Sequence, residues 1–245
     1  MSKEKKVLFV TGASSDIGSA LITDIAANYD AIWAHYCRSS KMIEDLQSVF
    51  GEKIIPVQAD FSDEKSVLKL IDQVKKSGQY PHHIVHLSAL KTENNRFHKF
   101  TWNDYQTGID TSLRSIVMIL QVFIPQMVKQ HYGKIVFMLT SCVLGVPPKY
   151  QSPYITTKYA LYGLMKCLAA EYAEKGISVN GVSPDMIETK FLDNIPKLII
   201  GQNAERSPLK RNLSVHDVIP AFRYLLSDDV VAITGHNLSI TGGMR

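Results

Sequence analysis

The chain has 245 residues, of which 45% are hydrophobic and 20% charged, and its formal net charge is +4. The length suits one large domain or two small ones, and the apolar fraction excludes a disordered chain. No apolar run approaches the ~18 residues of a membrane span, no basic stripe indicates nucleic acid binding, and three scattered cysteines without an export signal indicate a reduced, cytoplasmic protein.

Short apolar runs alternate with amphipathic stretches along the whole chain. We expect buried parallel strands at residues 6–10, 31–36, 54–58, 84–87, 135–139, 177–182 and 238–240. Helical spacing predicts helices at residues 17–28, 42–50, 64–76, 102–129, 154–174 and 215–226, with Asp63 and Ser214 as N-caps. Without a break in composition, this alternation predicts a single-domain, Rossmann-type α/β fold: a doubly wound parallel sheet of about seven strands with helices on both faces. Ligands of such sheets bind beyond the carboxyl ends of the strands.

The turn after the first strand, residues 11–18, reads Thr-Gly-Ala-Ser-Ser-Asp-Ile-Gly. A glycine-rich turn that opens a helix lets backbone N–H groups and the helix dipole face a pyrophosphate; an ordinary loop of small residues is the alternative. Asp16 stands where a middle glycine would let phosphate approach, and its charge repels phosphate, so it is a candidate cap of the helix instead. The candidate cofactor-binding residues of this turn are Gly12, Ser14, Ser15, Asp16, Ile17 and Gly18.

The end of the second strand distinguishes the two nicotinamide dinucleotides. An NAD site would place a carboxylate there for the ribose 2′-hydroxyl, but the chain has no acid in this stretch and carries Arg38 and Ser39 instead. These residues favour the 2′-phosphate of NADP, unless Arg38 is only a solvated surface residue. After the third strand, Asp60, followed by Phe61, is placed to accept from an adenine amino group or to cap the next helix.

A tyrosine and a lysine four residues apart, Tyr154 and Lys158, form the candidate catalytic pair. On one helix face, the ammonium favours phenolate, so we expect the pKa of Tyr154 to fall toward neutrality, as suits a general acid or base. Because Tyr162 and Lys166 have the same spacing, spacing alone does not identify the pair. Ser141 ends the fifth strand 13 residues before Tyr154, whereas no hydroxyl residue takes this place before Tyr162. We therefore prefer Tyr154.

Taken in order, these motifs resemble the short-chain dehydrogenase/reductase family, and within it the 3-oxoacyl-[acyl-carrier-protein] reductases. The resemblance covers nearly all 245 residues. It is carried by residues 11–18, Asp60, residues 133–141, residues 154–158, residues 179–184 and residues 234–243.

The resemblance implies NADPH-dependent reduction of a ketone to a secondary alcohol. In it, Tyr154 would give a proton to the carbonyl oxygen, Ser141 would hydrogen-bond that oxygen, and Lys158 would hold the nicotinamide ribose and lower the pKa of Tyr154. The resemblance also implies cofactor contacts from the segment after the sixth strand. It further implies that residues 186–211 form a substrate lid, although these residues could instead be a surface segment without a functional role. The contacts of this segment would come from Pro184, Ile187 and Thr189.

Three positions depart from the family pattern. After the fourth strand, where the family usually carries Asn-Asn-Ala-Gly, this chain has Leu-Ser-Ala-Leu at residues 87–90, so Ser88 and Ala89 would line the cofactor. The helix asparagine that anchors a water in the family's proton relay aligns with Ser112, which reaches less far. Asp185 replaces the glycine after Pro184. We expect these departures to affect the relay more than the Ser–Tyr–Lys chemistry.

The ketone itself stays open, from a 3-oxoacyl thioester on an acidic carrier protein to another secondary metabolite. Lys129, His131 and Lys175 match the family's carrier-binding patch, although helix ends attract cations anyway. The resemblance also implies a homo-oligomer, a tetramer or a dimer. We expect no metal site, because no His, Cys or Asp cluster has ligand spacing. The alternative function is a redox-silent NADP(H)-binding subunit or sensor.

Overall fold

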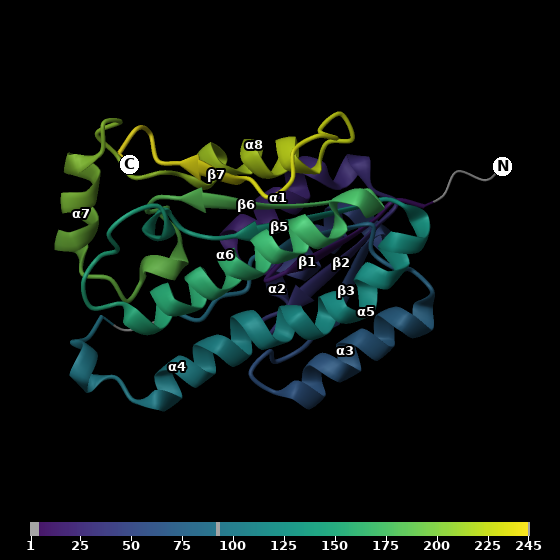
Figure 1. Cartoon of the computed structure of the whole chain (residues 1–245), viewed down its shortest axis with the longest axis horizontal. Coiled ribbons are helices and arrows are strands. Elements are labelled where there is room, and N and C mark those ends of the chain that lie inside the picture. Colours follow the sequence, from purple (N-terminus) through teal and green to yellow (C-terminus); the bar gives the residue numbers. More distant parts are fainter. Residues whose placement is uncertain (1–4, 92–93, 245) are drawn as a thin grey trace.

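The computed structural model of the chain describes residues 5–91 and 94–244. Seven strands form one parallel sheet in the order β3-β2-β1-β4-β5-β6-β7 (Figure 1), which confirms the predicted doubly wound architecture. The strands are β1 (Val7–Thr11), β2 (Ala31–Tyr36), β3 (Ile54–Gln58), β4 (His83–His86), β5 (Gly133–Met138), β6 (Ile177–Pro184) and β7 (Asn237–Ile240).

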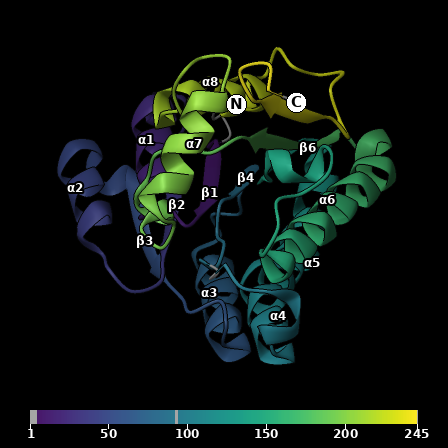
Figure 2. The ribbon, with the colours of Figure 1, turned by 90° about the vertical axis from the view of Figure 1, so that its left-hand side faces the viewer.

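Eight α-helices surround the sheet in the part of the chain that the structure describes. They are α1 (Asp16–Ile25), α2 (Lys41–Phe50), α3 (Glu64–Ser77), α4 (Trp102–Ile109), α5 (Ser115–Gln130), α6 (Ser152–Tyr172), α7 (Lys197–Arg206) and α8 (Val215–Leu226). Figure 2 shows α1, α2 and α8 on one side of the sheet, and α3, α4, α5 and α6 on the other. Asp63 and Ser214 cap α3 and α8 as predicted.

Both faces of the sheet are buried, because successive side chains of a strand point to opposite faces. In β1, Val7 and Phe9 pack into the cluster formed with α3, α5 and α6. Leu8 and Val10 pack into the cluster formed with α1, α2 and α8. This double burial explains why the strands read as continuous apolar runs in the sequence.

The helix predicted at residues 102–129 contains a feature that its apolar periodicity did not indicate. Between α4 and α5, residues Asp110–Arg114 form a single π-helical turn, so the helix is continuous but widened at that point. Such π turns change which backbone carbonyls are available to neighbouring groups.

The whole stretch Trp102–Gln130 is long and apolar enough to cross a membrane by length and composition. Seven of its α5 side chains are nevertheless buried within the fold, as in a core helix.

The carboxyl ends of the strands meet at one edge of the sheet, on the left in Figure 1. Residues 186–211, for which the sequence indicated no regular element, lie at this edge and contain the 3-10 turn Lys190–Leu192 and helix α7. The charged and polar faces of α7 carry little apolar periodicity, which is why the helix was missed. This edge therefore holds the candidate site.

Candidate active site

The turn between β1 and α1 has a backbone that only glycine fits at two positions. Gly12 has a φ of +66°, and a Cβ on Gly18 would lie 2.5 Å from the carbonyl oxygen of Gly12. Ser15, rather than Asp16, caps α1: its hydroxyl accepts from the Gly18 N–H at 3.1 Å and donates to the Gly12 carbonyl at 2.7 Å. The turn thus brings the helix N-terminus close to the end of β1, as the glycine spacing predicts.

Asp16 does not cap the helix, which corrects the role considered for it. Its carboxylate accepts a hydrogen bond from the Lys190 backbone N–H at 2.9 Å, so it joins the turn to the segment of residues 186–211. Ser14 and Ile17 are half-buried beside it. The carboxylate is thereby held by a donor across the cleft, 174 residues away in sequence.

A buried histidine that the sequence analysis missed holds the turn in place. The Nδ1 atom of His35 accepts from the Gly12 N–H at 3.0 Å, and its Nε2 lies 3.1 Å from the Ala59 carbonyl oxygen. The ring stacks on Phe61 with 3.9 Å between centroids. Burial lowers the pKa of His35 to about 4, so the ring is neutral and Nδ1 stays an acceptor. A polar residue within an otherwise buried strand was the signal that could have identified it.

Arg38 and Ser39 lie exposed beyond β2, where the sequence predicts the 2′-phosphate contact. Asp60 follows β3 nearby and accepts from both the amide and the hydroxyl of Ser62, at 2.9 Å and 2.7 Å. These two hydrogen bonds, together with the charge of Arg38, lower the pKa of Asp60. The structure therefore brings a guanidinium and an ionised carboxylate together at the edge beside the turn.

The end of β4 is joined to the turn through a second buried histidine. Thr11 Oγ1 accepts from the backbone N–H groups of Leu87 and Ser88, at 3.0 Å and 3.2 Å. It also lies 2.9 Å from Nδ1 of His86, whose Nε2 is 2.9 Å from the carbonyl oxygen of Ser112 in the π turn. Burial lowers the pKa of His86 to about 3, so it is a neutral link between β1 and the π turn.

Tyr154 and Lys158 lie in the first two turns of α6, which Pro153 opens. The Lys158 Nζ is 5.7 Å from the centre of the Tyr154 ring and donates to the Met138 carbonyl oxygen at 2.7 Å. Beside them is a cavity of about 10 Å³, near the size that holds one water. The cavity is lined by Ala89, Leu90, Gly108, Ser112, Tyr154, Thr157 and Lys158.

The second pair of the same spacing lies elsewhere. Lys166 Nζ is 5.6 Å from the centre of the Tyr162 ring, but it donates to the Gly235 carbonyl and is exposed. This pair lies two turns further along α6 and does not line the cavity beside Tyr154. Its geometry is that of a surface contact.

The expectation of a lowered Tyr154 pKa is wrong for this structure. Burial raises the pKa of Tyr154, although a hydrogen bond with the Thr140 side chain acts in the opposite direction. Burial also lowers the pKa of Lys158 to about 8. The low-dielectric surroundings disfavour both charges, and the ammonium is directed at the Met138 carbonyl rather than at the phenol. The phenol is therefore protonated at neutral pH, which is the state required of a proton donor.

The hydroxyl of Ser141 is near the end of β5, but it donates to the Asp185 carboxylate at 3.1 Å. Asp185 directly follows β6, at the position where the sequence departs from the family pattern. Pro184 ends β6, Ile187 forms an isolated bridge with Leu213, and Thr189 precedes the 3-10 turn. All these predicted residues lie at the carboxyl edge of the sheet.

Residues 186–211 cover Tyr154 from one side. The ring of Phe191 lies 6.2 Å from the Tyr154 ring, centre to centre. The Lys91 ammonium donates to the Lys190 carbonyl and pairs with Asp193 at 3.2 Å. With the Asp16 contact, two residues from different elements hold the 3-10 turn over the cleft.

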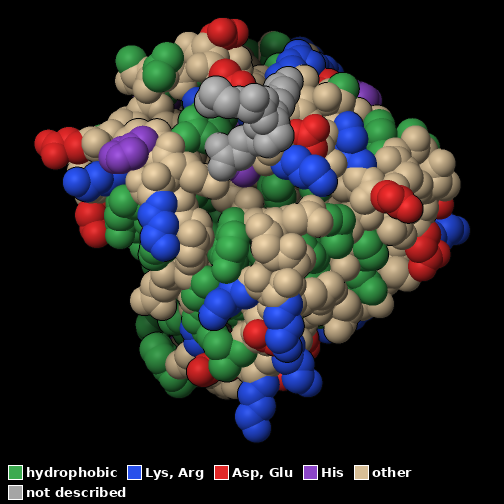
Figure 3. All heavy atoms as spheres, turned by 90° about the vertical axis from the view of Figure 1, so that its right-hand side faces the viewer, with side chains coloured by type: hydrophobic (Ala, Val, Ile, Leu, Met, Phe, Trp, Pro, Cys, Tyr) green, Lys and Arg blue, Asp and Glu red, His purple; other side chains and the backbone are tan. Residues whose placement is uncertain are grey.

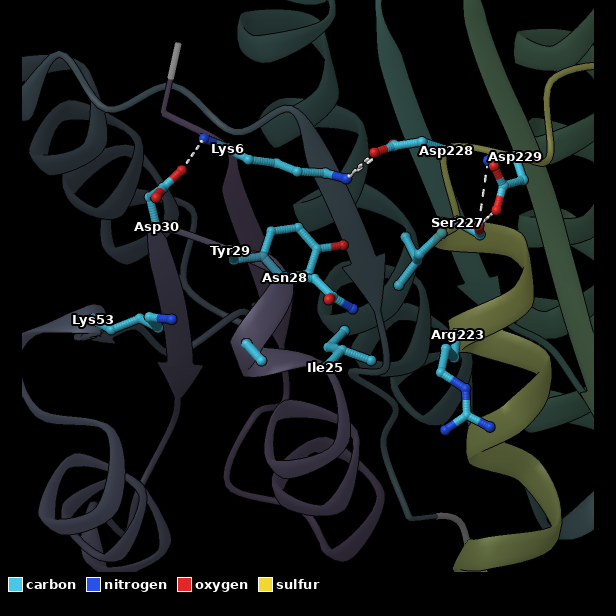
Figure 4. A pocket seen from close by; sticks show the side chains of 12 residues that line it. Lys6, Ile25, Asn28, Tyr29, Asp30, Lys53, Arg223, Ser227, Asp228 and Asp229 are labelled. Carbon is cyan, nitrogen blue, oxygen red and sulfur yellow. Dashed lines mark hydrogen bonds and ion pairs between the residues drawn. The ribbon is translucent and has the colours of Figure 1, made fainter. Parts of the chain in front are cut away.

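A larger hollow lies at the opposite, amino edge of the sheet. It has a volume of about 770 Å³ and is lined by the end of α1, the segment between α1 and β2, the end of α8 and the residues after it, with Lys6 and Lys53 beside them (Figure 4). Its charged groups bond to the protein itself: Lys6 with Asp228, Arg223 with Asp24, and Lys53 with the Ala26 carbonyl. Figure 3 shows this end of the molecule, where basic and acidic side chains are interspersed. It lacks the glycine turn and the Tyr–Lys pair, so we do not assign the function there.

Among the described residues, no group of three or more His, Cys, Asp and Glu side chains is placed to hold a metal ion. The site at the carboxyl edge therefore consists of a phosphate-type turn, a basic strand end and a buried phenol–ammonium pair. This combination defines a dinucleotide-dependent oxidoreductase site.

Comparison with known proteins identifies the family. The model described as "Enoyl-(Acyl carrier protein) reductase" matches residues 12–245, and the chain belongs to this family, within the short-chain dehydrogenases/reductases. It is 29% identical to the 3-oxoacyl-[acyl-carrier-protein] reductase FabG of Staphylococcus epidermidis, covering 98% of each chain. The FabG of Staphylococcus aureus is also 29% identical, with 99% of each chain covered.

Solved structures show the same fold. The structure titled "ElxO with NADP Bound" superposes with a TM-score of 0.86 at 28% identity, over 98% of both chains. A putative gluconate dehydrogenase from Agrobacterium tumefaciens gives a TM-score of 0.88 at 22% identity, covering 98% of this chain and 95% of its own. The predicted family and fold class are therefore confirmed.

Proposed function

We propose that the chain reduces a ketone to a secondary alcohol with NADPH as the hydride donor and Tyr154 as the general acid. The observation that carries this proposal is the position of Tyr154 and Lys158 at the carboxyl edge of the sheet, beside a glycine turn of the dinucleotide-binding type. The ElxO structure, which is titled with NADP bound, supports the choice of cofactor.

The residues of the cleft fit NADP(H). A Cβ on Gly12 would lie 3.3 Å from the Ser88 backbone nitrogen, so glycine lets the turn pack closely on the chain after β4, while the N-terminus of α1 faces the place where a pyrophosphate is expected. Arg38, with no carboxylate between residues 35 and 40, suits a 2′-phosphate. The remaining proposed contacts come from Ser14, Ser15, Asp16, Ile17, Gly18, Ser39, Asp60, Phe61, Ser88, Ala89, Pro184, Ile187 and Thr189.

Bound NADPH supplies a hydride to the carbonyl carbon. Tyr154 gives its phenolic proton to the carbonyl oxygen and becomes a phenolate; with the hydride on carbon and the proton on oxygen, the C=O double bond becomes a C–O single bond with one new C–H and one new O–H bond. Lys158, which reaches the ribose side of the cleft in the family pattern, stabilises the phenolate by its charge. The low pKa of Lys158 also lets it pass a proton onward at a pH near 8.

Ser112 and the cavity of about 10 Å³ lie on the path by which a proton returns to Tyr154. Such a cavity accommodates one water in contact with the Lys158 ammonium and the π turn. The Ser112 carbonyl oxygen accepts a hydrogen bond from His86, and the Ser112 side chain lines the cavity. Ser112 thus takes the part of the family's relay asparagine.

We further propose that residues 186–211 act as a substrate lid, that the 245 residues form a single catalytic domain, and that the protein is a cytoplasmic homo-oligomer, a tetramer or a dimer. The substrate is a 3-oxoacyl thioester on a carrier protein, or a related secondary-metabolite ketone. The names of the Staphylococcus relatives support the carrier-bound thioester. The apolar residues Met118, Val122, Leu164 and Leu168 of α5 and α6 are only partly buried in the single chain, which supports association.

The purified protein is tested with NADPH and a panel of 3-oxoacyl thioesters and cyclic ketones, by the loss of reduced-nicotinamide absorbance. We expect turnover in the wild type and a loss of about 10²- to 10⁴-fold in Tyr154→Phe. The matched control is Tyr162→Phe, which removes the same hydroxyl from the surface pair and is expected to stay active. Tight NADPH binding without turnover, and without oxidation of the matching alcohols, would instead show a redox-silent subunit.

A further inference from the structure

His86 is a buried ionisable residue close to the candidate site, and the reaction described above does not use it. It is the last residue of β4, and only 1% of it is exposed. In the sheet it lies between Thr11 of β1 and Phe137 of β5, and its ring packs edge-on against the Phe137 ring with 6.0 Å between the centres. Each of its ring nitrogens has a hydrogen-bonding partner, and the two partners belong to different parts of the site.

The partners of His86 determine the direction of both hydrogen bonds. The carbonyl oxygen of Ser112 can only accept, so Nε2, which lies 2.9 Å away, carries the proton and donates it. Thr11 Oγ1 accepts from the two backbone N–H groups that follow β4, so its own proton is directed at Nδ1, 2.9 Å away. Burial lowers the pKa of His86 to about 3, which agrees with a neutral ring. The imidazole is therefore held as the Nε2–H tautomer.

This ring connects two walls of the small cavity beside Tyr154. The walls come from the chain after β4, from α4 with its π turn, and from the start of α6: Ala89 and Leu90, then Gly108 and Ser112, then Tyr154, Thr157 and Lys158. Because His86 ends β4 and donates to the π turn, it fixes the first two walls relative to each other. The cavity of about 10 Å³ is near the smallest that holds a water, so a small inward shift of one wall is enough to exclude the water.

The length of the imidazole matters because the residue opposite it is short. Ser112 stands where the family pattern has an asparagine, and a serine hydroxyl reaches less far than an amide. The hydrogen bond between the end of β4 and the π turn Asp110–Arg114 is instead made by the His86 side chain and the Ser112 backbone carbonyl. The position of Ser112 beside the cavity thus depends on a residue that does not line the cavity itself.

We propose that His86 is a positioning residue for the proton relay, because its Nε2–H holds the Ser112 carbonyl and thereby sets the wall of the cavity through which Tyr154 is reprotonated. The inference rests on the proposed reductase function for its kinetic consequence, but not for the hydrogen bond itself. His86 acts through Ser112 and exchanges no proton with Tyr154. Its loss therefore slows the return of the proton and leaves the binding of substrate and cofactor as it is.

Two substitutions of similar size separate the Nε2–H donor from the ring. In His86→Gln an amide nitrogen takes about the place of Nε2, whereas the shorter side chain of His86→Asn stays beside Thr11 and does not reach Ser112. One hydrogen bond corresponds to roughly 3- to 10-fold in rate. We expect kcat with NADPH and a ketone to fall by this factor in His86→Asn and to stay within about twofold of wild type in His86→Gln. KM and the NADPH dissociation constant are expected to be unchanged in both variants.

The control is His83→Asn, which removes a buried ring from the other end of β4 and is expected to leave kcat unchanged. A role in stability alone would not distinguish Gln from Asn at residue 86. Equal values of kcat in His86→Gln and His86→Asn, whether both are lowered or both unchanged, would overturn the inference.

Two further measurements do not require turnover. In NMR correlation spectra of the nitrogen-labelled wild type, we expect the His86 ring, assigned by its absence in His86→Gln, to carry its proton on Nε2; an Nδ1–H tautomer or a charged ring at neutral pH would contradict the proposal. Hydrogen exchange in the π turn Asp110–Arg114, followed by mass spectrometry, is expected to be faster in His86→Asn than in His86→Gln, and equal exchange would also contradict it. If no ketone is reduced, the proposed function fails, while these two measurements still decide whether His86 holds the π turn.

Discussion

The two ends of β4 carry two buried histidines, three residues apart, in different kinds of network. At the amino end, the Tyr29 hydroxyl lies 2.7 Å from Nδ1 of His83, and Nε2 lies 2.7 Å from the Tyr132 hydroxyl. The Tyr132 hydroxyl donates to Asp228, which also pairs with Lys6. Because the carboxylate only accepts, the direction of each bond follows: Tyr29 donates to Nδ1, and Nε2–H donates to Tyr132.

At the carboxyl end, His86 connects Thr11 to the carbonyl of Ser112, and Thr11 also accepts from the backbone N–H groups of Leu87 and Ser88, so this network contains no ionised side chain. The neighbouring phenol and ammonium of Tyr154 and Lys158 face a cavity rather than a carboxylate. The amino end satisfies its charges with its own side chains, which suits a structural role. The carboxyl end keeps hydrogen-bonding capacity for a ligand, which suits a site.

The largest expected effect tests what His83 and His86 have in common with His35, the third buried histidine of the sheet. Burial lowers the pKa of His35 to about 4 and of His86 to about 3, and it lowers the pKa of His83 well below its usual value. These rings stay neutral in the folded chain, whereas the unfolded chain takes up their protons below about pH 6.5. We expect the free energy of unfolding to be highest above that pH and to fall as the pH decreases, with a slope that approaches about 4 kcal/mol per pH unit for the three groups about one pH unit below 6.5.

Urea unfolding curves recorded at several pH values between 7 and 5 give the free energy of unfolding at each pH, and hence this slope. His86→Gln removes one of the three groups and is expected to reduce the slope by about 1.4 kcal/mol per pH unit. His216→Gln, at the exposed start of α8, is the control for the His-to-Gln substitution itself. An unchanged slope in His86→Gln would mean that the ring is protonated or exposed in the folded chain.

The second-largest expected effect concerns NADPH affinity, which we expect to depend on the carboxyl edge of the sheet. Arg38→Ala is expected to weaken NADPH binding by roughly 10- to 100-fold, because a charge-assisted hydrogen bond contributes about 1.5–3 kcal/mol. NADH, which lacks the 2′-phosphate, should bind as before. Fluorescence titration measures both dissociation constants, and Lys69→Ala on the exposed face of α3 controls for the loss of one positive charge. Equal weakening for both nucleotides would contradict the 2′-phosphate assignment.

The smallest effect concerns the amino end. Tyr29→Phe leaves Nδ1 of His83 buried without its donor, so we expect a loss of about 1–2 kcal/mol in the free energy of unfolding and no change in the NADPH dissociation constant. Tyr80→Phe is the matched control: it removes a hydroxyl from a half-buried ring that packs against Phe123, and should change stability by less than about 0.5 kcal/mol. Weaker NADPH binding in Tyr29→Phe would show that the amino end also supports the site.

The sequence was sufficient for those features that depend on residues close together in the chain. Apolar runs, helical periodicity and the glycine spacing of residues 11–18 determined the strands, most helices and the phosphate-type turn. They also placed Tyr154 and Lys158 one helical turn apart at the carboxyl edge. Local spacing is enough here, because the backbone geometry of a helix or strand directly sets which neighbouring side chains share a face.

The tertiary structure decided the contacts between residues far apart in sequence. Ser141 and Asp185 are separated by 44 positions, and Asp16 and Lys190 by 174, so no local pattern indicated either hydrogen bond. The roles of His35 and His86 as neutral links likewise follow from burial, which lowers their pKa values only once the sheet is assembled. The sequence alone determined most of the elements that this chain forms and the position of Tyr154 and Lys158. The packing of distant strands decided which donors and acceptors meet beside them, because desolvation and hydrogen-bond direction exist only in the folded state.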